Sequence, residues 1–333
     1  MKIFEKIYDN IDKDFGDFTK KTTKNSDIKS MYDFVGDLNE GLAQVILKGK
    51  YGFIDKTGNE IIPCKYNNAW IVSDGFIKAT LNGKMGLLDK AGKEICPIKY
   101  DDVWDFGEGL VPVKLNGKWG YIDKTGKEVI PCKYHWGSYF AGGLALVTLN
   151  NKSGFIDKTG KEVIPCKYDY AGYFFEGLAQ VGLNNKFGYI DKTGKEVIPC
   201  KYNGTNNFKE GLAAVNLNGK CGVIDKTGRE ICPCKYDWVY DFFKGLAKVK
   251  LNNKYGYIDK TGKEVIPCIF DGITYNNQMF YVKFRGKYGC INQLGDMFVP
   301  CIFDIAPYLE DGKIKMVNDG ISTIYSLEGE IIY

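Results

Sequence analysis

The stretch "GYIDKTGKEVIPCKY", from Gly120 to Tyr134, decides the fold because it recurs. The same letters return unchanged from Gly188 to Tyr202. The glycine of a preceding Lys-x-Gly element recurs every 34 residues, and a last time after 33, at Gly52, Gly86, Gly120, Gly154, Gly188, Gly222, Gly256 and Gly289. A fixed period of this length is typical of solenoids, propellers and arrays. We therefore predict nine units from about residue 31 to the end, the ninth of them degenerate.

Each unit predicts three β-strands. In one copy, Leu246–Leu251 alternates apolar residues with lysine, which indicates a strand with one solvent-exposed face. Asn252-Asn253 then supplies residues that tolerate the positive φ of a tight hairpin. Tyr255–Asp259 is the second predicted strand, and an Asp-Lys-Thr-Gly turn follows it. Glu264–Cys268 is the third, and its proline is expected at a strand end or a sheet edge.

The second and third strands are apolar on both faces, so each unit is expected to lie between its two neighbours. We predict an all-β repeat protein whose three-stranded units form an open β-solenoid, with a closed β-propeller as the alternative. Residues 1–30 are expected to form a helical cap and linker, 31–302 eight repeats, and 303–333 a degenerate ninth repeat. The cap is predicted from apolar residues at helical spacing: Ile3, Phe4, Ile7, Tyr8, Ile11 and Phe15.

The repeated residues resemble the bacterial WG-repeat (KWG-repeat) family. The residues that match its signature in order are Lys118, Trp119, Gly120, Tyr121, Ile122, Asp123, Thr125, Gly126, Val129, Ile130, Pro131 and Tyr134. The other units replace the tryptophan by Tyr51, Met85, Ser153, Phe187, Cys221, Tyr255 and Tyr288. The resemblance implies a β-repeat fold and a binding or scaffold role, without a shared catalytic residue.

Composition sets limits on location and partners. The net charge of +4 is small for 333 residues, which does not favour strong attraction to nucleic acid or membranes. Neither a signal peptide nor a run of 18 apolar residues is visible, so we expect a cytoplasmic protein. The eleven cysteines should then be reduced, and six that follow a proline should be mostly buried: Cys64, Cys132, Cys166, Cys200, Cys234 and Cys268.

Catalytic and metal-binding patterns are weak. His135 is the chain's one histidine, which excludes Ser-His, Cys-His and multi-histidine sites built by this chain alone. Cys232 and Cys234 lack the Cys-x-x-Cys spacing of a zinc or redox motif. The aspartate in each Asp-Lys-Thr-Gly turn is expected to close a hairpin. We therefore predict no enzyme activity, no cofactor and no metal.

The copies differ most between the tyrosine and the next Gly-Leu, so recognition is expected there. The candidate partner-binding residues are Trp70, Trp104, Trp136, Tyr139, Tyr170, Tyr173, Trp238 and Tyr240. They predict a non-enzymatic module that binds a protein or peptide, since Trp and Tyr dominate interface energies. In the alternative interpretation, these segments form a fourth short strand and bury their aromatic residues.

Two further hypotheses remain open. The solvent-exposed face of the first predicted strand is a second candidate surface, with Lys78, Lys114, Gln180, Lys248 and Lys250 among its residues. The lysine-lined turns could instead bind nucleic acid or another polyanion. The near balance of 45 basic and 41 acidic residues opposes that function.

Overall fold

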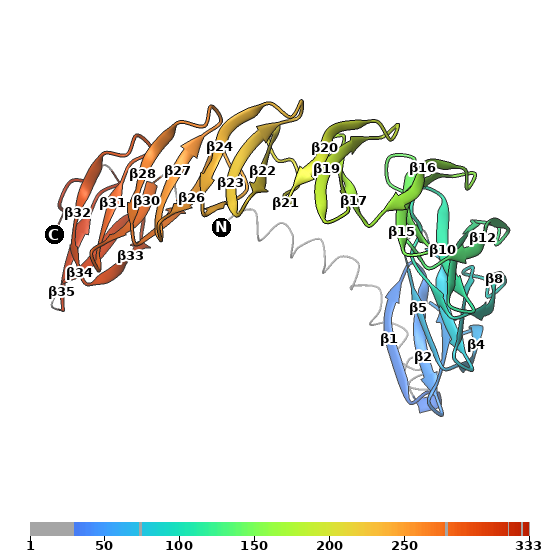
Figure 1. Cartoon of the computed structure of the whole chain (residues 1–333). Coiled ribbons are helices and arrows are strands. Elements are labelled where there is room, and N and C mark those ends of the chain that lie inside the picture. The colour runs from blue at the N-terminus through green and yellow to red at the C-terminus, as the bar shows by residue number, and fades with distance from the viewer. Residues whose placement is uncertain (1–29, 73–74, 277–278, 319, 328, 333) are drawn as a thin grey trace. The chain divides into compact units, whose positions relative to one another are not determined.

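The computed structural model describes residues 30–72, 75–276, 279–318, 320–327 and 329–332. The predicted N-terminal helix falls on residues 1–29 and so lies outside the described residues. The chain divides into two compact units, the first ending at Cys166 and the second beginning at Lys167. Within the described residues, the strands form nine consecutive sheets, one for each repeat (Figure 1). The first eight sheets have four antiparallel strands in chain order, and the ninth has three.

The variable segment supplies the first strand of each sheet, which corrects our prediction of three strands per unit. These first strands are β1 (Phe34–Asn39), β5 (Asn68–Ile71), β9 (Asp102–Val103), β13 (Trp136–Gly137), β17 (Tyr170–Phe175), β21 (Gly204–Thr205), β25 (Trp238–Val239), β29 (Gly272–Asn276) and β33 (Ile305–Glu310). Each lies at one edge of its sheet. The interpretation of these segments as short additional strands is therefore correct.

The second and third strands form the predicted hairpin. The second strands are β2 (Leu42–Leu47), β6 (Ile77–Leu81), β10 (Leu110–Leu115), β14 (Leu144–Leu149), β18 (Leu178–Leu183), β22 (Leu212–Leu217), β26 (Leu246–Leu251), β30 (Met279–Phe284) and β34 (Lys313–Asn318). The third strands are β3 (Lys50–Asp55), β7 (Lys84–Leu88), β11 (Lys118–Asp123), β15 (Lys152–Asp157), β19 (Lys186–Asp191), β23 (Lys220–Asp225), β27 (Lys254–Asp259), β31 (Lys287–Ile291) and β35 (Ile321–Tyr325). Between β26 and β27, Asn252 and Asn253 take φ values of 50° and 60°, as the tight turn requires.

The fourth strands run past the proline, which corrects the predicted strand end. They are β4 (Glu60–Tyr66), β8 (Glu94–Tyr100), β12 (Glu128–Tyr134), β16 (Glu162–Tyr168), β20 (Glu196–Tyr202), β24 (Glu230–Tyr236), β28 (Glu264–Phe270) and β32 (Met297–Phe303). In β24, the register shifts between Cys232 and Tyr236, so Pro233 lies in a bulge at the sheet edge. An edge position suits proline because the missing N–H costs no ladder hydrogen bond.

The bulge explains the repeated glycine. A Cβ atom on Gly222 would lie 2.6 Å from the carbonyl oxygen of Cys232 and 2.8 Å from the amide nitrogen of Cys234. The glycine at this position in the other seven repeats is equally crowded, with a backbone atom closer than 3.0 Å to the added Cβ. Glycine and the Pro-Cys bulge therefore recur together because each accommodates the other.

Within each unit, neighbouring sheets pack face to face. In the first unit, Phe53 of the first sheet shares a buried cluster with Leu88 of the second. In the second unit, Val223 of the sixth sheet packs in one cluster with Val249 and Ile258 of the seventh. The other face of the sixth sheet packs against the fifth, where Val215 and Ile224 share a cluster with Tyr189, so the prediction that neighbouring repeats cover both faces is confirmed for this sheet. The open solenoid stays a prediction, because ring closure depends on the placement of the two units.

Candidate functional site

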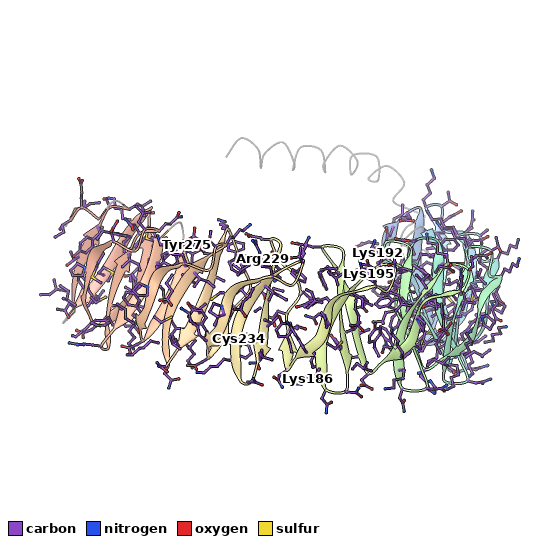
Figure 2. All side chains as sticks on the ribbon, turned by 45° about the horizontal axis from the view of Figure 1, so that its top comes forward. Lys186, Lys192, Lys195, Arg229, Cys234 and Tyr275 are labelled. Atoms are coloured by element: carbon purple, nitrogen blue, oxygen red, sulfur yellow. The ribbon has the colours of Figure 1, made fainter. Side chains whose placement is uncertain are left out.

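Each third strand has a turn at either end. The turns before it and the turns after it recur from repeat to repeat and form two sets. Figure 2 shows Lys186 at the start of β19, and Lys192 and Lys195 in the turn that follows it, at opposite ends of the strand. In this second turn, the Oδ1 atom of Asp191 accepts hydrogen bonds from the Thr193 hydroxyl at 2.6 Å and the Lys195 amide at 3.1 Å. These bonds lower the pKa of Asp191, the Thr193 hydroxyl most. The aspartate therefore closes the hairpin, as predicted.

In four repeats of the described residues, a glutamate near the same turn links its sheet to the next. Glu176 accepts a hydrogen bond from the Gly211 amide at 3.0 Å and pairs with the Lys226 ammonium at 2.9 Å. Both partners belong to the following repeat. The hydrogen bond from Lys226 lowers the pKa of Glu176. Equivalent glutamate–lysine ion pairs hold four turn lysines in the described residues: Lys90, Lys158, Lys226 and Lys260.

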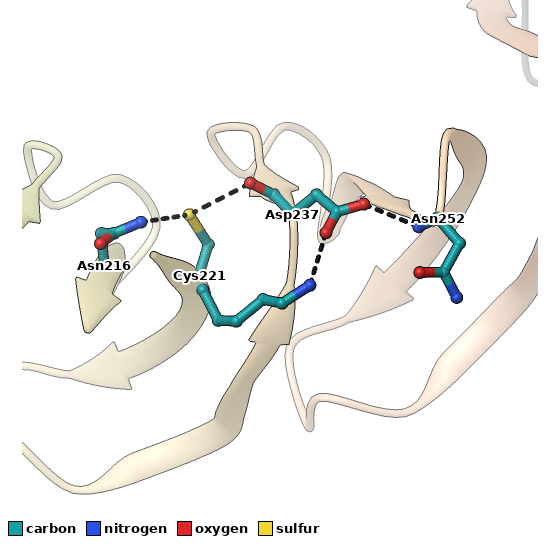
Figure 3. Close-up of polar contacts among 5 residues, drawn as sticks. Asn216, Cys221, Asp237 and Asn252 are labelled. Carbon is teal, nitrogen blue, oxygen red and sulfur yellow. Dashed lines mark hydrogen bonds and ion pairs between the residues drawn. The ribbon is translucent and has the colours of Figure 1, made fainter. Parts of the chain in front are cut away.

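The other set of turns is capped by the residue after the repeated tyrosine. Asp237 accepts a hydrogen bond from the Asn252 amide at 2.7 Å (Figure 3) and another from the Lys220 ammonium at 2.6 Å. The Lys220 bond lowers the pKa of Asp237 most. His135 occupies the same repeat position, and its Nδ1 accepts a hydrogen bond from the Asn150 amide at 3.3 Å. The chain's one histidine is therefore a turn cap.

This capping pattern was not used in our sequence prediction, although the sequence contains it. The capping position holds an acceptor side chain in eight consecutive repeats: Asp33, Asn67, Asp101, His135, Asp169, Asn203, Asp237 and Asp271. The first letter of each variable segment is thus structural. Only the letters that follow it are free to determine a binding surface.

The structure divides the eight candidate aromatic residues into two groups. Three are half-buried: Trp70, Trp104 and Trp136. Five are exposed: Tyr139, Tyr170, Tyr173, Trp238 and Tyr240. Trp238 has the largest exposed fraction of the five, 53%. The buried-strand interpretation therefore holds in part for the three half-buried tryptophans, and the five exposed residues stay candidates for partner binding.

Trp104 belongs to an aromatic cluster in the first unit. Its ring centroid lies 4.6 Å from that of Trp119, 6.5 Å from Trp136 and 5.2 Å from Tyr139. Its indole N–H donates to the Asp102 carboxylate at 3.2 Å. Since Trp119 is buried, Trp104 contributes to packing as well as to the surface.

The second unit carries the more exposed aromatic residues. The rings of Trp238 and Tyr240 lie 6.3 Å apart. Two exposed phenylalanines that the sequence prediction missed, Phe175 and Phe243, lie in the same variable segments. Each is the second letter of a Phe-Phe pair directly before the Gly turn, and in one of the pairs the first ring, Phe242, is buried. The pair Phe242-Phe243 therefore places one ring in the core and the other at the surface.

The face predicted to be solvent-exposed is instead an interface between sheets. Lys78 and Gln180 are only 8% and 9% exposed, and Lys248 is half-buried. The Gln180 amide donates to the Thr205 carbonyl at 3.0 Å, which belongs to the next sheet. Alternation identified which residues share a face. It could not show that the next repeat covers that face.

The cysteines are free thiols, as predicted. The six cysteines that we expected to be mostly buried are half-buried. Cys200 donates a weak hydrogen bond to the Val181 carbonyl at 3.6 Å, and burial raises the pKa of its thiol. Among the described residues, no group of three or more His, Cys, Asp or Glu side chains is arranged to hold a metal ion. The described residues also include no helix long and apolar enough to span a membrane.

Comparison with known proteins identifies the family. The WG containing repeat matches nine segments: residues 28–51, 51–84, 85–119, 119–152, 154–187, 187–221, 222–255, 255–288 and 288–320. The chain belongs to the WG-repeat family. This confirms the resemblance drawn from the repeated residues. No curated protein matches the chain in sequence.

Several solved structures are similar to the chain. A eukaryotic initiation factor shares 10% identity, with 89% of this chain and 96% of that chain covered and a TM-score of 0.36. Kluyveromyces lactis Hsv2 shares 7%, covering 68% and 94%, with a TM-score of 0.32. The dihydro-heme d1 dehydrogenase NirN in complex with DHE shares 13%, covering 91% and 74%, with a TM-score of 0.31. At these values, the activities of the three proteins say nothing about this chain.

Proposed function

We propose that this WG-repeat chain is a non-catalytic module that binds a segment of a partner protein through its first-strand edge. The observation that carries the proposal is the exposure of aromatic side chains in the variable segments of the second unit. They are Tyr170, Tyr173, Phe175, Trp238, Tyr240 and Phe243. Exposed apolar residues that gather on one surface commonly mark a protein interaction site. Tyrosine and tryptophan are also the residues that supply most interface energy.

The turn lysines favour a protein partner over nucleic acid. A polyanion surface requires cations that are free to contact phosphates. Four of these lysines already pair with a glutamate of the preceding repeat, including Lys226 with Glu176 and Lys260 with Glu210. The net charge of +4 adds little further attraction.

The proposal includes an open stack of sheets and a cytoplasmic location. Eleven cysteines, all free thiols, suit a reducing compartment. An open stack would present successive first-strand edges as one extended surface for a partner segment.

The test is capture of partners from a cell lysate by the full chain, with and without nuclease. The variant Tyr170→Ala/Tyr173→Ala/Trp238→Ala should lose at least 90% of the captured partner while its melting curve stays close to the parent's, because the three side chains are exposed. The matched control is Ile269→Ala/Ile302→Ala, which removes exposed apolar side chains from the fourth-strand edge. Equal loss in both variants would contradict the proposal. Capture abolished by nuclease would support the polyanion alternative.

A further inference from the structure

A cavity of about 200 Å³ lies in the second unit, beside the exposed aromatic residues of the seventh repeat. Its lining residues are Tyr240, Asp241, Phe243, Leu246, Lys248, Tyr257 and Tyr275. Tyr275, on β29 of the eighth sheet, is labelled in Figure 2. Tyr240 and Phe243 are exposed, with Phe243 at 63%, so apolar rings stand at the mouth of the cavity.

Lys248 brings a positive charge to this cavity without a carboxylate partner among the described residues. Its Nζ donates to the Ile273 carbonyl at 2.8 Å and lies 4.4 Å from the ring centroid of Tyr255. A lysine ammonium has three donors, and this is its one hydrogen bond within the described part of the chain. Partial burial lowers the pKa of Lys248, which reflects the cost of a poorly solvated charge.

The second repeat shows how such a lysine is neutralised. Lys78 occupies the same repeat position as Lys248, and its Nζ pairs with the Asp105 carboxylate at 3.0 Å. Asp105 follows Lys78 by 27 residues, and the residue 27 positions after Lys248 is Tyr275. The chain thus supplies a counter-ion for Lys78, and it places an aromatic ring at the equivalent position beside Lys248.

The one acid that lines the cavity is already paired. Asp241 accepts a hydrogen bond from the Asn206 amide at 3.0 Å and forms an ion pair with Lys209 at 2.8 Å. Lys244 adds a further positive charge at the rim, 5.4 Å from the ring centroid of Phe243. The cavity and its rim therefore carry a net positive charge beside apolar walls.

We propose that this cavity binds an acidic side chain of the partner segment, with its carboxylate on the Lys248 ammonium and a flanking apolar residue against Tyr240 and Phe243. The proposal rests on the proposed function and specifies its partner as an acidic-aromatic segment. A side-chain carboxylate is the expected ligand because Asp105 provides one to Lys78. A volume of about 200 Å³ suits one side chain, since pockets for drug-sized ligands start at about 300 Å³.

The test is fluorescence polarisation of labelled peptides with the full chain. The probe is Gly-Ser-Phe-Glu-Phe-Ser-Gly with an amidated end, compared with the same peptide carrying Gln in place of Glu. The parent should bind the Glu peptide about 10-fold more tightly, as a charge-assisted hydrogen bond in a partly buried site allows. A third peptide, with Gln and a free carboxyl end, should bind no better than the amidated Gln peptide.

Three variants locate the preference. Lys248→Gln should abolish it and stay folded, because Gln180 holds this repeat position and donates to the next strand in the same way. Lys250→Gln, which removes a neighbouring charge from outside the cavity lining, should keep it. Tyr275→Asp should also abolish it, because the new carboxylate would occupy Lys248 as Asp105 occupies Lys78.

Distinct outcomes separate this proposal from the proposed function. A parent that binds the Glu and Gln peptides equally, or a preference that survives both Lys248→Gln and Tyr275→Asp, overturns the cavity assignment. Tight binding of the Gln peptide with a free carboxyl end would show that the cavity takes a terminal carboxylate, and it overturns the assignment of a side-chain carboxylate as the ligand. In either case, aromatic-dependent capture from lysate would leave the proposed function standing. Capture from lysate that is unchanged when the exposed aromatic residues are replaced by alanine would refute the proposed function itself.

Discussion

Replacing the repeated glycine by alanine should strongly destabilise the fold, and Gly222→Ala is the variant to test. The new Cβ would lie 2.6 Å from the Cys232 carbonyl oxygen and 2.8 Å from the Cys234 amide nitrogen. These distances are roughly 1 Å inside the usual contact distance. The opposing atoms are backbone atoms of a bulge, so they cannot move aside as the end of a flexible side chain would. Since overpacking typically costs about 1–3 kcal/mol, we expect a loss of about 3 kcal/mol in the free energy of unfolding.

The matched control for this variant is Gly204→Ala in the same sheet. Its new Cβ would meet only the Asn216 Cβ, at 3.8 Å, which is an ordinary contact. We expect it to change the free energy of unfolding by no more than about 1 kcal/mol. The lower entropy of the unfolded chain favours the alanine variant and offsets part of any loss in the folded state. Urea unfolding followed by circular dichroism measures both variants. The reasoning fails if Gly222→Ala unfolds within about 0.5 kcal/mol of the parent.

Three further predictions concern carboxylates and thiols. Glu210→Ala should lower the free energy of unfolding by about 1 kcal/mol by urea titration, because it removes one ion pair and one amide hydrogen bond to the next repeat. Glu230→Ala should match the parent, because the Glu230 side chain makes no hydrogen bond within the described residues. Hydrogen bonds, the Thr57 hydroxyl first, lower the pKa of Asp55 to about 2, so the folded chain binds fewer protons than the unfolded chain; stability should be full above about pH 4 and fall towards pH 2, and a melting temperature constant from pH 5 to 2 would contradict this. Burial raises the pKa of Cys96 to about 12, so the Cys96 thiol of the native protein should react with a thiol reagent at pH 7 far more slowly than the same thiol in urea-unfolded protein. Equal labelling rates at Cys96 would refute this.

The sequence was most informative where the repeat is strict. The span Leu246–Leu251 matches β26 residue for residue, because alternation and an Asn-Asn turn are local signals. Pro233 was misjudged because proline often ends a strand. The bulge that accommodates Pro233 depends on Gly222 of the neighbouring strand, and this contact is not visible in a local pattern.

Exposure of the candidate site residues could not be predicted, because it depends on the packing of neighbouring sheets. Trp104 and Trp238 belong to equivalent variable segments, yet one packs on Trp119 and the other is 53% exposed. The prediction of a solvent-exposed face was wrong for the same reason, since Lys78 and Lys248 extend to the next sheet. A single unit read alone contains no information about what covers it.

The glutamate that joins neighbouring repeats has a consequence for how the gene can change length. Glu176 bonds to residues 35 and 50 positions later, Gly211 and Lys226. Deleting residues 203–236 would bring Gly245 and Lys260 to those same distances from Glu176, because both groups recur in the next copy. The join would therefore re-form after an in-frame loss, or a duplication, of one whole copy. Unequal recombination between the near-identical copies can then shorten or extend the binding surface without leaving an unpaired carboxylate at this join.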